Sequence, residues 1–153
     1  VCSRDSGSDG LYLLMTSTQY PYYRINNSTI TTSTAYANEW VYLTATYDGT
    51  TQKLYINGSI AGSATTSQTI SVGSNTTIGK SSFNVGEFIN GNLANVAIWN
   101  RALHSDEINA IMWKSYGDLN AVDKNGLQAW YALDNITGTT VPDSTGTNNG
   151  TAN

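Results

Sequence analysis

Charged side chains are scarce in this chain of 153 residues. They make up 12% of the residues, which is about half the share usual for a soluble globular domain. The net charge is −4, and no cluster of Lys and Arg offsets it. The electrostatic footprint of a nucleic-acid-binding protein is therefore missing, and we expect no nucleic acid among the partners.

Long apolar runs and paired cysteines are missing too. No stretch approaches the ~20 apolar residues of a membrane span, and no signal-peptide pattern opens the chain. The single cysteine, Cys2, cannot close an internal disulfide and offers no metal-site spacing. We expect no membrane partner, and the redox compartment stays open.

Groups for catalysis are equally sparse. The only histidine, His104, stands just before a predicted helix, where a solvated or capping role is favoured over a Ser–His–Asp relay. Zinc lacks a ligand set, and no glycine-rich phosphate cradle precedes a helix. No strand carries the alternating acids of a retaining glycosidase. The sequence predicts a protein that is not an enzyme, with a glycoside hydrolase as the least favoured alternative.

Thr, Ser, Asn and Gly supply the polarity instead, a mixture that favours strands joined by tight turns. The ten tyrosines and four tryptophans are too many for a disordered linker. Short apolar or alternating runs predict strands at 11–15, 20–25, 41–47, 52–56, 60–62, 76–79, 96–100 and 127–133. The four tryptophans are expected in the core.

Two turn signals join the clearest of these strands. Asp48-Gly49 follows the strand that starts after Trp40, and Asn57-Gly58 is the strongest short hairpin signal. The spacing of Ile108, Ile111 and Met112 then predicts one helix of about three turns, with Ser105 as its N-cap. The whole pattern predicts an all-β, two-sheet antiparallel jelly-roll sandwich with one short helix.

Three ordered motifs resemble the laminin-G-like branch of the concanavalin A-like lectin/glucanase superfamily. They are Trp40 to Gly49, the hairpin Leu54-Tyr55-Ile56-Asn57-Gly58, and the run from Gly91 to Ile108. The resemblance implies a jelly-roll domain of the tandem type found in bacterial surface proteins and phage structural proteins. Family members often carry acids where Ala94 and Asn95 stand here, which leaves a calcium site at that position in doubt.

The order of the motifs departs from the family. Residues 126–153 resemble the start of a domain, yet they follow the other motifs. We therefore expect a sandwich at 1–116 that lacks its usual first strands, a linker at 117–125, and the first strand and loop of a following or permuted unit at 126–153. Three explanations stay open: a piece of a tandem polypeptide, a strand folded back beside 96–100, or strand addition to an identical chain.

Aromatic rings in or beside predicted loops are the candidates for glycan binding, because sugars stack their C–H faces on such rings. The candidates are Tyr20, Tyr22, Tyr23 and Tyr36. The same tyrosines could instead cover the sheet or a subunit contact. Asp5 and Asp9 are weak candidates for an oxygen-ligated metal such as calcium.

The sequence thus favours a non-catalytic binding or adhesion module of a larger extracellular, cell-surface or virion-surface protein. Its expected partners are an adjacent domain or identical chain that completes the sandwich, together with carbohydrate. The alternative is a purely structural subunit, such as a capsid decoration, fibre or filament unit held by strand addition between copies.

Overall fold

The computed structural model describes residues 2–6, 9–70, 76–80 and 88–152. The chain divides into two compact units, Val1–Asn90 (unit 1) and Gly91–Asn153 (unit 2). All strand pairs of the described residues are antiparallel, which confirms the predicted all-β fold. None of the helices in this described part has the length and apolar character needed to cross a membrane.

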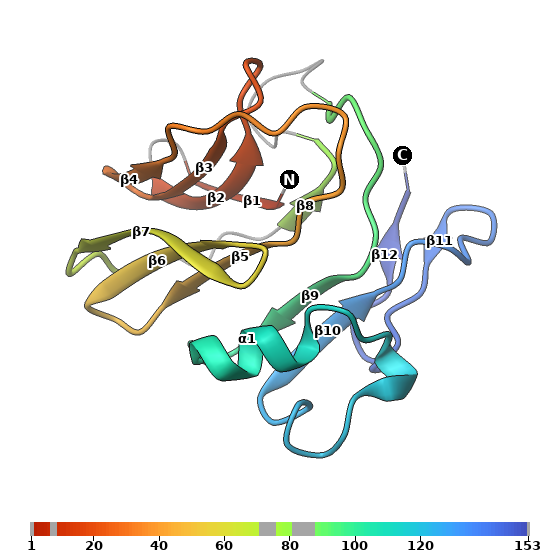
Figure 1. Cartoon of the computed structure of the whole chain (residues 1–153). Coiled ribbons are helices and arrows are strands. Elements are labelled where there is room, and N and C mark those ends of the chain that lie inside the picture. The colour runs from red at the N-terminus through yellow and green to blue at the C-terminus, as the bar shows by residue number, and fades with distance from the viewer. Residues whose placement is uncertain (1, 7–8, 71–75, 81–87, 153) are drawn as a thin grey trace. The chain divides into compact units, whose positions relative to one another are not determined.

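Unit 1 is a sandwich of two sheets (Figure 1). The five-stranded sheet has the order β4-β3-β2-β1-β8, and the three-stranded sheet has the order β5-β6-β7. Buried Tyr23, Ile25 and Ile30 of the first sheet form one core cluster with Leu54 of the second. The strands of unit 1 are β1 Cys2–Ser6, β2 Asp9–Met15, β3 Pro21–Ile25, β4 Ser28–Thr31, β5 Leu43–Tyr47, β6 Thr51–Ile56, β7 Ser59–Thr65 and β8 Thr76–Ile78.

The turn signals of the sequence are confirmed. Asp48 accepts backbone hydrogen bonds from Thr50 (2.9 Å) and Thr51 (2.7 Å) through Oδ1, which closes the turn before β6. Asn57 and Gly58 have φ angles of 49° and 79°. These left-handed angles are those of a type I′ turn, whose twist matches that of a two-stranded hairpin.

The sheet begins later than the sequence predicted in the region of Trp40. Strand β5 starts at Leu43, so Trp40 lies in the preceding loop and is 69% exposed. Its predicted place in the core is therefore wrong. Alternation cannot bury a side chain that precedes the paired part of the strand.

A close approach between the two sheets depends on Gly62. A Cβ added at this position of β7 would lie 2.5 Å from Cγ2 of Ile30, a buried residue of β4. We predict that Gly62→Ala lowers the free energy of unfolding by about 1–2 kcal/mol, because Ile30 must move within a packed core. Urea unfolding would measure this change in the free energy of unfolding. Gly49→Ala is not a matched control because its φ of 98° is itself strained, so Ala61→Ser, exposed on the same strand, serves instead.

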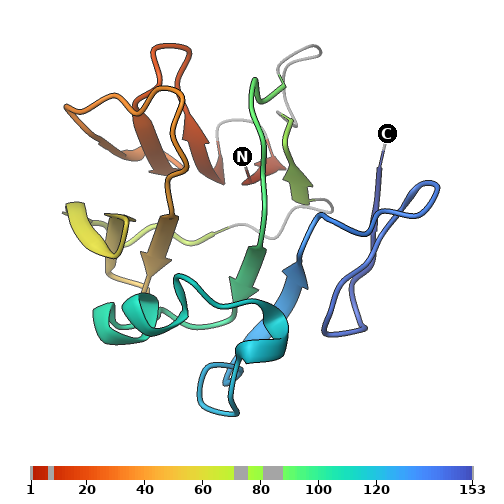
Figure 2. The same cartoon turned by 45° about the vertical axis from the view of Figure 1, so that its right-hand side comes forward.

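Unit 2 joins the end of the predicted sandwich to the predicted following unit. Strand β10 pairs with β9, from Leu127 opposite Trp99 to Tyr131 opposite Val96, and the two strands lie side by side in both views (Figures 1 and 2). The fold-back beside 96–100 is thus the pairing observed in the chain. The elements of unit 2 are β9 Val96–Trp99, α1 Ser105–Ile111, the 3₁₀ turn η1 Tyr116–Asp118, β10 Leu127–Tyr131, β11 Thr140–Val141 and β12 Gly150–Thr151.

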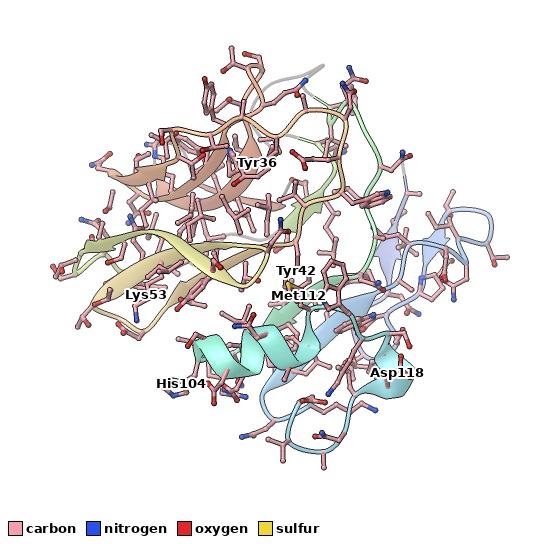
Figure 3. All side chains as sticks on the ribbon, in the orientation of Figure 1. Tyr36, Tyr42, Lys53, His104, Met112 and Asp118 are labelled. Carbon is pink, nitrogen blue, oxygen red and sulfur yellow. The ribbon has the colours of Figure 1, made fainter. Side chains whose placement is uncertain are left out.

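Helix α1 is shorter than predicted. Its seven residues make about two turns, and its N-cap is His104 rather than Ser105. The backbone N–H of His104 donates to Glu107 (2.8 Å), which is the carboxylate half of a capping box. The sequence offered Ser105 as the better cap, but the helical conformation already includes that residue. Figure 3 labels His104 at the start of α1, where the residue is exposed.

Aromatic rings fill the small core of unit 2. Trp130 is 2% exposed and meets Trp99 edge to face, with ring centroids 6.3 Å apart. Tyr116 lies at the same distance on a tilted plane. The core prediction is confirmed for Trp130, whereas Trp113 lies two residues beyond the end of α1 and is 80% exposed. Its predicted burial is wrong because it lies beyond the face that buries Ile108 and Ile111.

Candidate functional site

The candidate tyrosines of the sequence do not share one environment. Tyr23 is 1% exposed, lies in the core of unit 1, and donates its hydroxyl to the backbone oxygen of Thr46 (3.3 Å). Burial raises the pKa of its hydroxyl, and Tyr47 raises it further. Tyr23 therefore cannot stack on a ligand, which corrects its place among the glycan candidates.

Strand alternation explains the difference between Tyr23 and its neighbour. Pro21, Tyr23 and Ile25 are buried on one face of β3, while Tyr22 and Arg24 are half-buried on the other. Adjacent residues of a strand point to opposite faces. The outer face of the five-stranded sheet thus receives Tyr22.

Other side chains join Tyr22 on this outer face. Tyr12 stands opposite Arg24, whose guanidinium lies over the Tyr12 ring, 5.8 Å from the ring centroid. Thr29 stands on the other side of Arg24, and its hydroxyl is 3.5 Å from that of Tyr22. The sequence pointed to Tyr22 but missed Tyr12 and Arg24, which only the register between β2 and β3 brings together.

Tyr20 and Tyr36 lie near the same end of β3. The backbone of Tyr20 is fixed by its N–H to Thr16 Oγ1 (3.0 Å), and the N–H of Tyr36 donates to the carbonyl of Gln19 (3.0 Å). Figure 3 labels Tyr36 beside the strands of this sheet. Tyr20 directly precedes β3, so strand pairing does not fix the face of its ring. We name the outer-face set of the paired strands the tyrosine face, made of Tyr12, Leu14, Tyr22, Arg24 and Thr29.

The tyrosine face combines apolar rings with polar edges. Tyr12 and Tyr22 are half-buried, so each side chain keeps part of its surface in water. Arg24 offers a guanidinium whose Nε donates to the backbone oxygen of Asn26, and Thr29 offers an exposed hydroxyl. Flat aromatic surface beside hydrogen-bonding groups suits a ligand with apolar C–H patches and many hydroxyls.

Several acids of unit 2 are engaged in structural bonds, most completely Asp143. It is 4% exposed, and its carboxylate accepts backbone hydrogen bonds from Trp130 (2.8 Å), Thr145 (3.0 Å) and Asn148 (3.0 Å). Burial alone would raise the pKa of Asp143, but the hydrogen bonds from Thr145, Trp130 and Asn148 hold it at about 2. The sequence predicted only a strand and a loop at 126–153 and gave no signal of this role.

A second carboxylate holds the end of β9 to the helix. Arg101 makes a two-pronged ion pair with Glu107 (2.8 and 2.7 Å) and also donates from Nε to the carbonyl of Asn125 (2.9 Å). Hydrogen bonds from Arg101 and from the backbone of His104 lower the pKa of Glu107 to about 2. Within the family-like run from Gly91 to Ile108, the ion pair of Arg101 and Glu107 therefore has a structural role.

Three further acids are held in interactions that lower their pKa values, which makes them poor proton donors. Hydrogen bonds from Thr50 lower the pKa of Asp48, those from Ser115 lower that of Asp118, and Lys114 lowers that of Asp123. A pocket of about 150 Å³ lies beside the ion pair of Arg101 and Glu107. It falls short of the ~300 Å³ at the lower end of ordinary small-ligand sites.

The predicted metal candidates lie at the β1–β2 hairpin. The backbone of Asp5 pairs with Gly10, and that of Asp9 with Ser6, but the side chains of Asp5 and Asp9 lie outside the described part. Among the described residues, no three His, Cys, Asp or Glu side chains form a group that could hold a metal ion. Calcium at Asp5 and Asp9 stays a prediction.

The chain belongs to the concanavalin A-like lectin/glucanase superfamily, since a model of that family matches residues 1–109. The resemblance carried by the motifs from Trp40 onward is thereby confirmed. Strand β10 lies beyond the matched segment, yet it pairs with β9 inside it. No curated protein matches the sequence.

A solved structure shares the fold. A protein of Bacteroides ovatus ATCC 8483, described as a "putative carbohydrate binding protein", superposes with a TM-score of 0.79 at 18% identity, over 99% of this chain and 46% of that one. An S-layer domain-containing protein of Clostridium thermocellum ATCC 27405 gives a TM-score of 0.44 at 26% identity, over 73% of this chain and 61% of that one. The chain thus spans less than two thirds of either neighbour.

Proposed function

We propose that the chain is a non-catalytic carbohydrate-binding module and that it binds glycans on the tyrosine face. The observation that carries this proposal is the outer face of the five-stranded sheet, where Tyr12, Tyr22 and Arg24 meet in register. Rings, a cation and hydroxyls stand together on this face, which suits a ligand with apolar C–H patches and many hydroxyls. Membership of a lectin/glucanase superfamily and the description of the Bacteroides ovatus protein agree with this choice.

The absence of catalysis is part of the proposal. Glycoside hydrolysis needs one carboxyl group free to donate a proton and a second free to attack or to activate water. In unit 2, Glu107 is held by Arg101, Asp123 by Lys114, and Asp143 by backbone donors. Ionised carboxylates locked in such bonds are poor acids, and their depressed pKa values disfavour the protonated form.

The module is proposed to act in a larger protein outside the cell, at a cell or virion surface where glycans are presented. The solved neighbours are longer than this chain, the Bacteroides ovatus protein about twice as long. We further propose the domain limits expected from the sequence: a sandwich at 1–116, a linker at 117–125, and the beginning of a following or permuted unit at 126–153. Adhesion would follow from several such modules on one polypeptide.

A structural subunit is the second candidate, favoured by large apolar side chains at the surface of unit 1. Trp40 and Ile60 are 69% and 58% exposed, and such residues are common at contacts between copies. Light scattering across a range of protein concentrations separates the two candidates. A chain that self-associates and binds no glycan would replace the carbohydrate proposal with the architectural one.

Removing two rings tests the binding surface. We predict that the double variant Tyr12→Ala/Tyr22→Ala lowers affinity for a bound polysaccharide at least tenfold, because both aromatic contacts with the sugar are lost. A tenfold loss corresponds to about 1.4 kcal/mol of binding free energy. The wild-type ligand is first found by depletion on insoluble cellulose, chitin, xylan and mannan. Affinity electrophoresis in gels that contain the soluble form of that polymer then gives the loss.

Trp113→Ala is the matched control, since it removes an exposed aromatic ring from unit 2. It should leave the affinity unchanged. Melting curves of both variants establish that they are folded. If Trp40→Ala abolished binding while the double tyrosine variant bound like the wild type, the site would lie at the loop before β5 and the tyrosine face would be excluded.

A further inference from the structure

Asn-Gly pairs are places where this chain can modify its own backbone. Glycine has no Cβ, so its nitrogen can approach the side chain of the preceding asparagine closely. The asparagines of the four pairs are Asn57, Asn90, Asn125 and Asn149. Two of these side chains are fixed by hydrogen bonds. Oδ1 of Asn57 accepts the backbone N–H of Tyr42 (2.9 Å), and Oδ1 of Asn149 accepts that of Asp143 (2.9 Å).

The Asn125-Gly126 pair is fixed in another way. Asn125 is exposed, and within the described residues neither its side-chain amide nor the backbone N–H of Gly126 makes a hydrogen bond. The contact lies on the backbone instead, where Nε of Arg101 donates to the carbonyl oxygen of Asn125 (2.9 Å). The pair is therefore held through its peptide group and not through its side chain.

The peptide group between Asn125 and Gly126 lies in a tight turn. The N–H of Leu127 donates to the carbonyl of Lys124 (3.0 Å), and Gly126 has a φ of 80° at the third position. These are the features of a type II turn, which fixes ψ of the second residue, Asn125. A five-membered ring through the Gly126 nitrogen and the Asn125 side chain needs a different ψ. The peptide group must therefore rotate before such a ring can close.

Arg101 opposes this rotation. Turning the peptide group swings the carbonyl of Asn125 away from the guanidinium and breaks their hydrogen bond. Both oxygens of Glu107 hold the same guanidinium (2.8 and 2.7 Å), so it does not follow the carbonyl. A hydrogen bond from a charged donor is stronger than one between neutral groups. The open form of the turn is thus rare while Arg101 is in place.

We propose that Asn125 is a site of spontaneous deamidation and that Arg101 controls its rate. When the turn opens, the Gly126 nitrogen loses its proton and bonds to Cγ of Asn125. The bond from Cγ to Nδ2 breaks, and ammonia leaves with that proton, which gives a cyclic imide. Water then opens the imide. Breaking the new C–N bond gives aspartate, and breaking the original peptide bond gives isoaspartate.

Isoaspartate at this position would not fit the turn, because it adds one carbon to the backbone. Gly126 is packed so closely that a Cβ there would lie 2.7 Å from Oδ1 of Asn100. The backbone N–H of Asn100 also donates to the carbonyl of Gly126 (2.9 Å). The modification should therefore displace the loop that leads into β10 and weaken its pairing with β9.

Peptide mapping by mass spectrometry, after the chain is aged at mildly alkaline pH, tests the proposal. The deamidated fraction at each Asn-Gly pair is followed in the wild type and in Arg101→Ala. Loss of Arg101 should raise the rate at Asn125 by about tenfold, the factor that corresponds to one hydrogen bond. The exposed Asn90 is the reference within the same digests, and its rate should stay unchanged.

Asp143→Asn is the control for a general loss of stability, because it destabilises unit 2 but leaves the contact of Arg101 with Asn125. Its rate at Asn125 should stay within about twofold of the wild type, since the local opening of the turn is unaltered. An Arg101→Ala chain that deamidates at Asn125 no faster than the wild type would overturn the proposal. Equal acceleration by both variants would overturn it too, because unfolding of the whole unit would then set the rate.

Discussion

Replacing Asp143 by alanine is expected to lower the free energy of unfolding of unit 2 by about 3 kcal/mol or more. The carboxylate is buried and accepts backbone N–H groups of Trp130, Thr145 and Asn148. Its loss would strand the N–H of Trp130 inside the aromatic core, and each such group costs about 1–3 kcal/mol. Urea unfolding followed by tryptophan fluorescence measures the change.

Asp134→Ala removes an exposed acid from the same unit and is the matched control, with an expected change within about 0.5 kcal/mol. Asp143→Asn should fall between the two, because the amide keeps one acceptor oxygen but has lost the charge. An alanine variant at Asp143 that unfolds at the same urea concentration as the wild type would show that the loop does not depend on this carboxylate.

Lowering the pH should destabilise the fold by protonating Asp143 and weakening the same hydrogen bonds. Asp143 has a pKa of about 2 in the folded chain, against 3.8 for an ordinary aspartate. A depressed folded pKa stabilises the fold above pH 4, and this stabilisation is lost as the pH falls from 4 towards 2. The loss is about 2 kcal/mol from this group. Asp143→Asn should flatten this part of the pH dependence of unfolding.

Replacing Arg101 by alanine is expected to cost about 2 kcal/mol. The guanidinium binds both oxygens of Glu107 and the carbonyl of Asn125, so it joins the end of β9 to α1 and to the loop before β10. The ion pair is about a quarter exposed, which limits its share of the effect because water screens it. The loss of the Asn125 contact adds the remainder.

The paired variants separate the ion pair from the rest. Arg101→Lys keeps the charge but not the planar fork and should recover less than half of the loss. In a cycle with Glu107→Gln, the double variant should be less destabilised than the sum of the single variants, by about 1 kcal/mol. Strict additivity in that cycle, measured by urea unfolding, would mean that Arg101 and Glu107 do not stabilise the unit together.

Local chemistry made much of the fold predictable. The left-handed angles that Asn57 and Gly58 accept specify the hairpin, and the spacing of apolar residues specified both β9 and β10. Helix α1 was found for the same reason, although its start was displaced by one residue. Each of these signals acts over a few neighbours, which is why the sequence reports it.

The candidate site depends on register, which sequence does not report. Tyr22 and Tyr23 are adjacent and chemically alike, and only the pairing of β3 with its neighbours decides which one enters the core. Tyr12 joins Arg24 across the same pairing. Asp143 acts on residues up to 13 positions away, among them Trp130. The exposure of Trp40 depends on where a strand begins, a boundary that alternation marks poorly.

The most direct test of glycan binding on the tyrosine face is an NMR titration of the isotope-labelled chain with the oligosaccharide that binds most tightly. The largest shift changes should fall on the amides and side chains of Tyr12, Tyr22, Arg24 and Thr29, with unit 2 unchanged. Changes that cluster instead on β5–β7 or on the loop at Trp40 would contradict a binding surface on the five-stranded sheet.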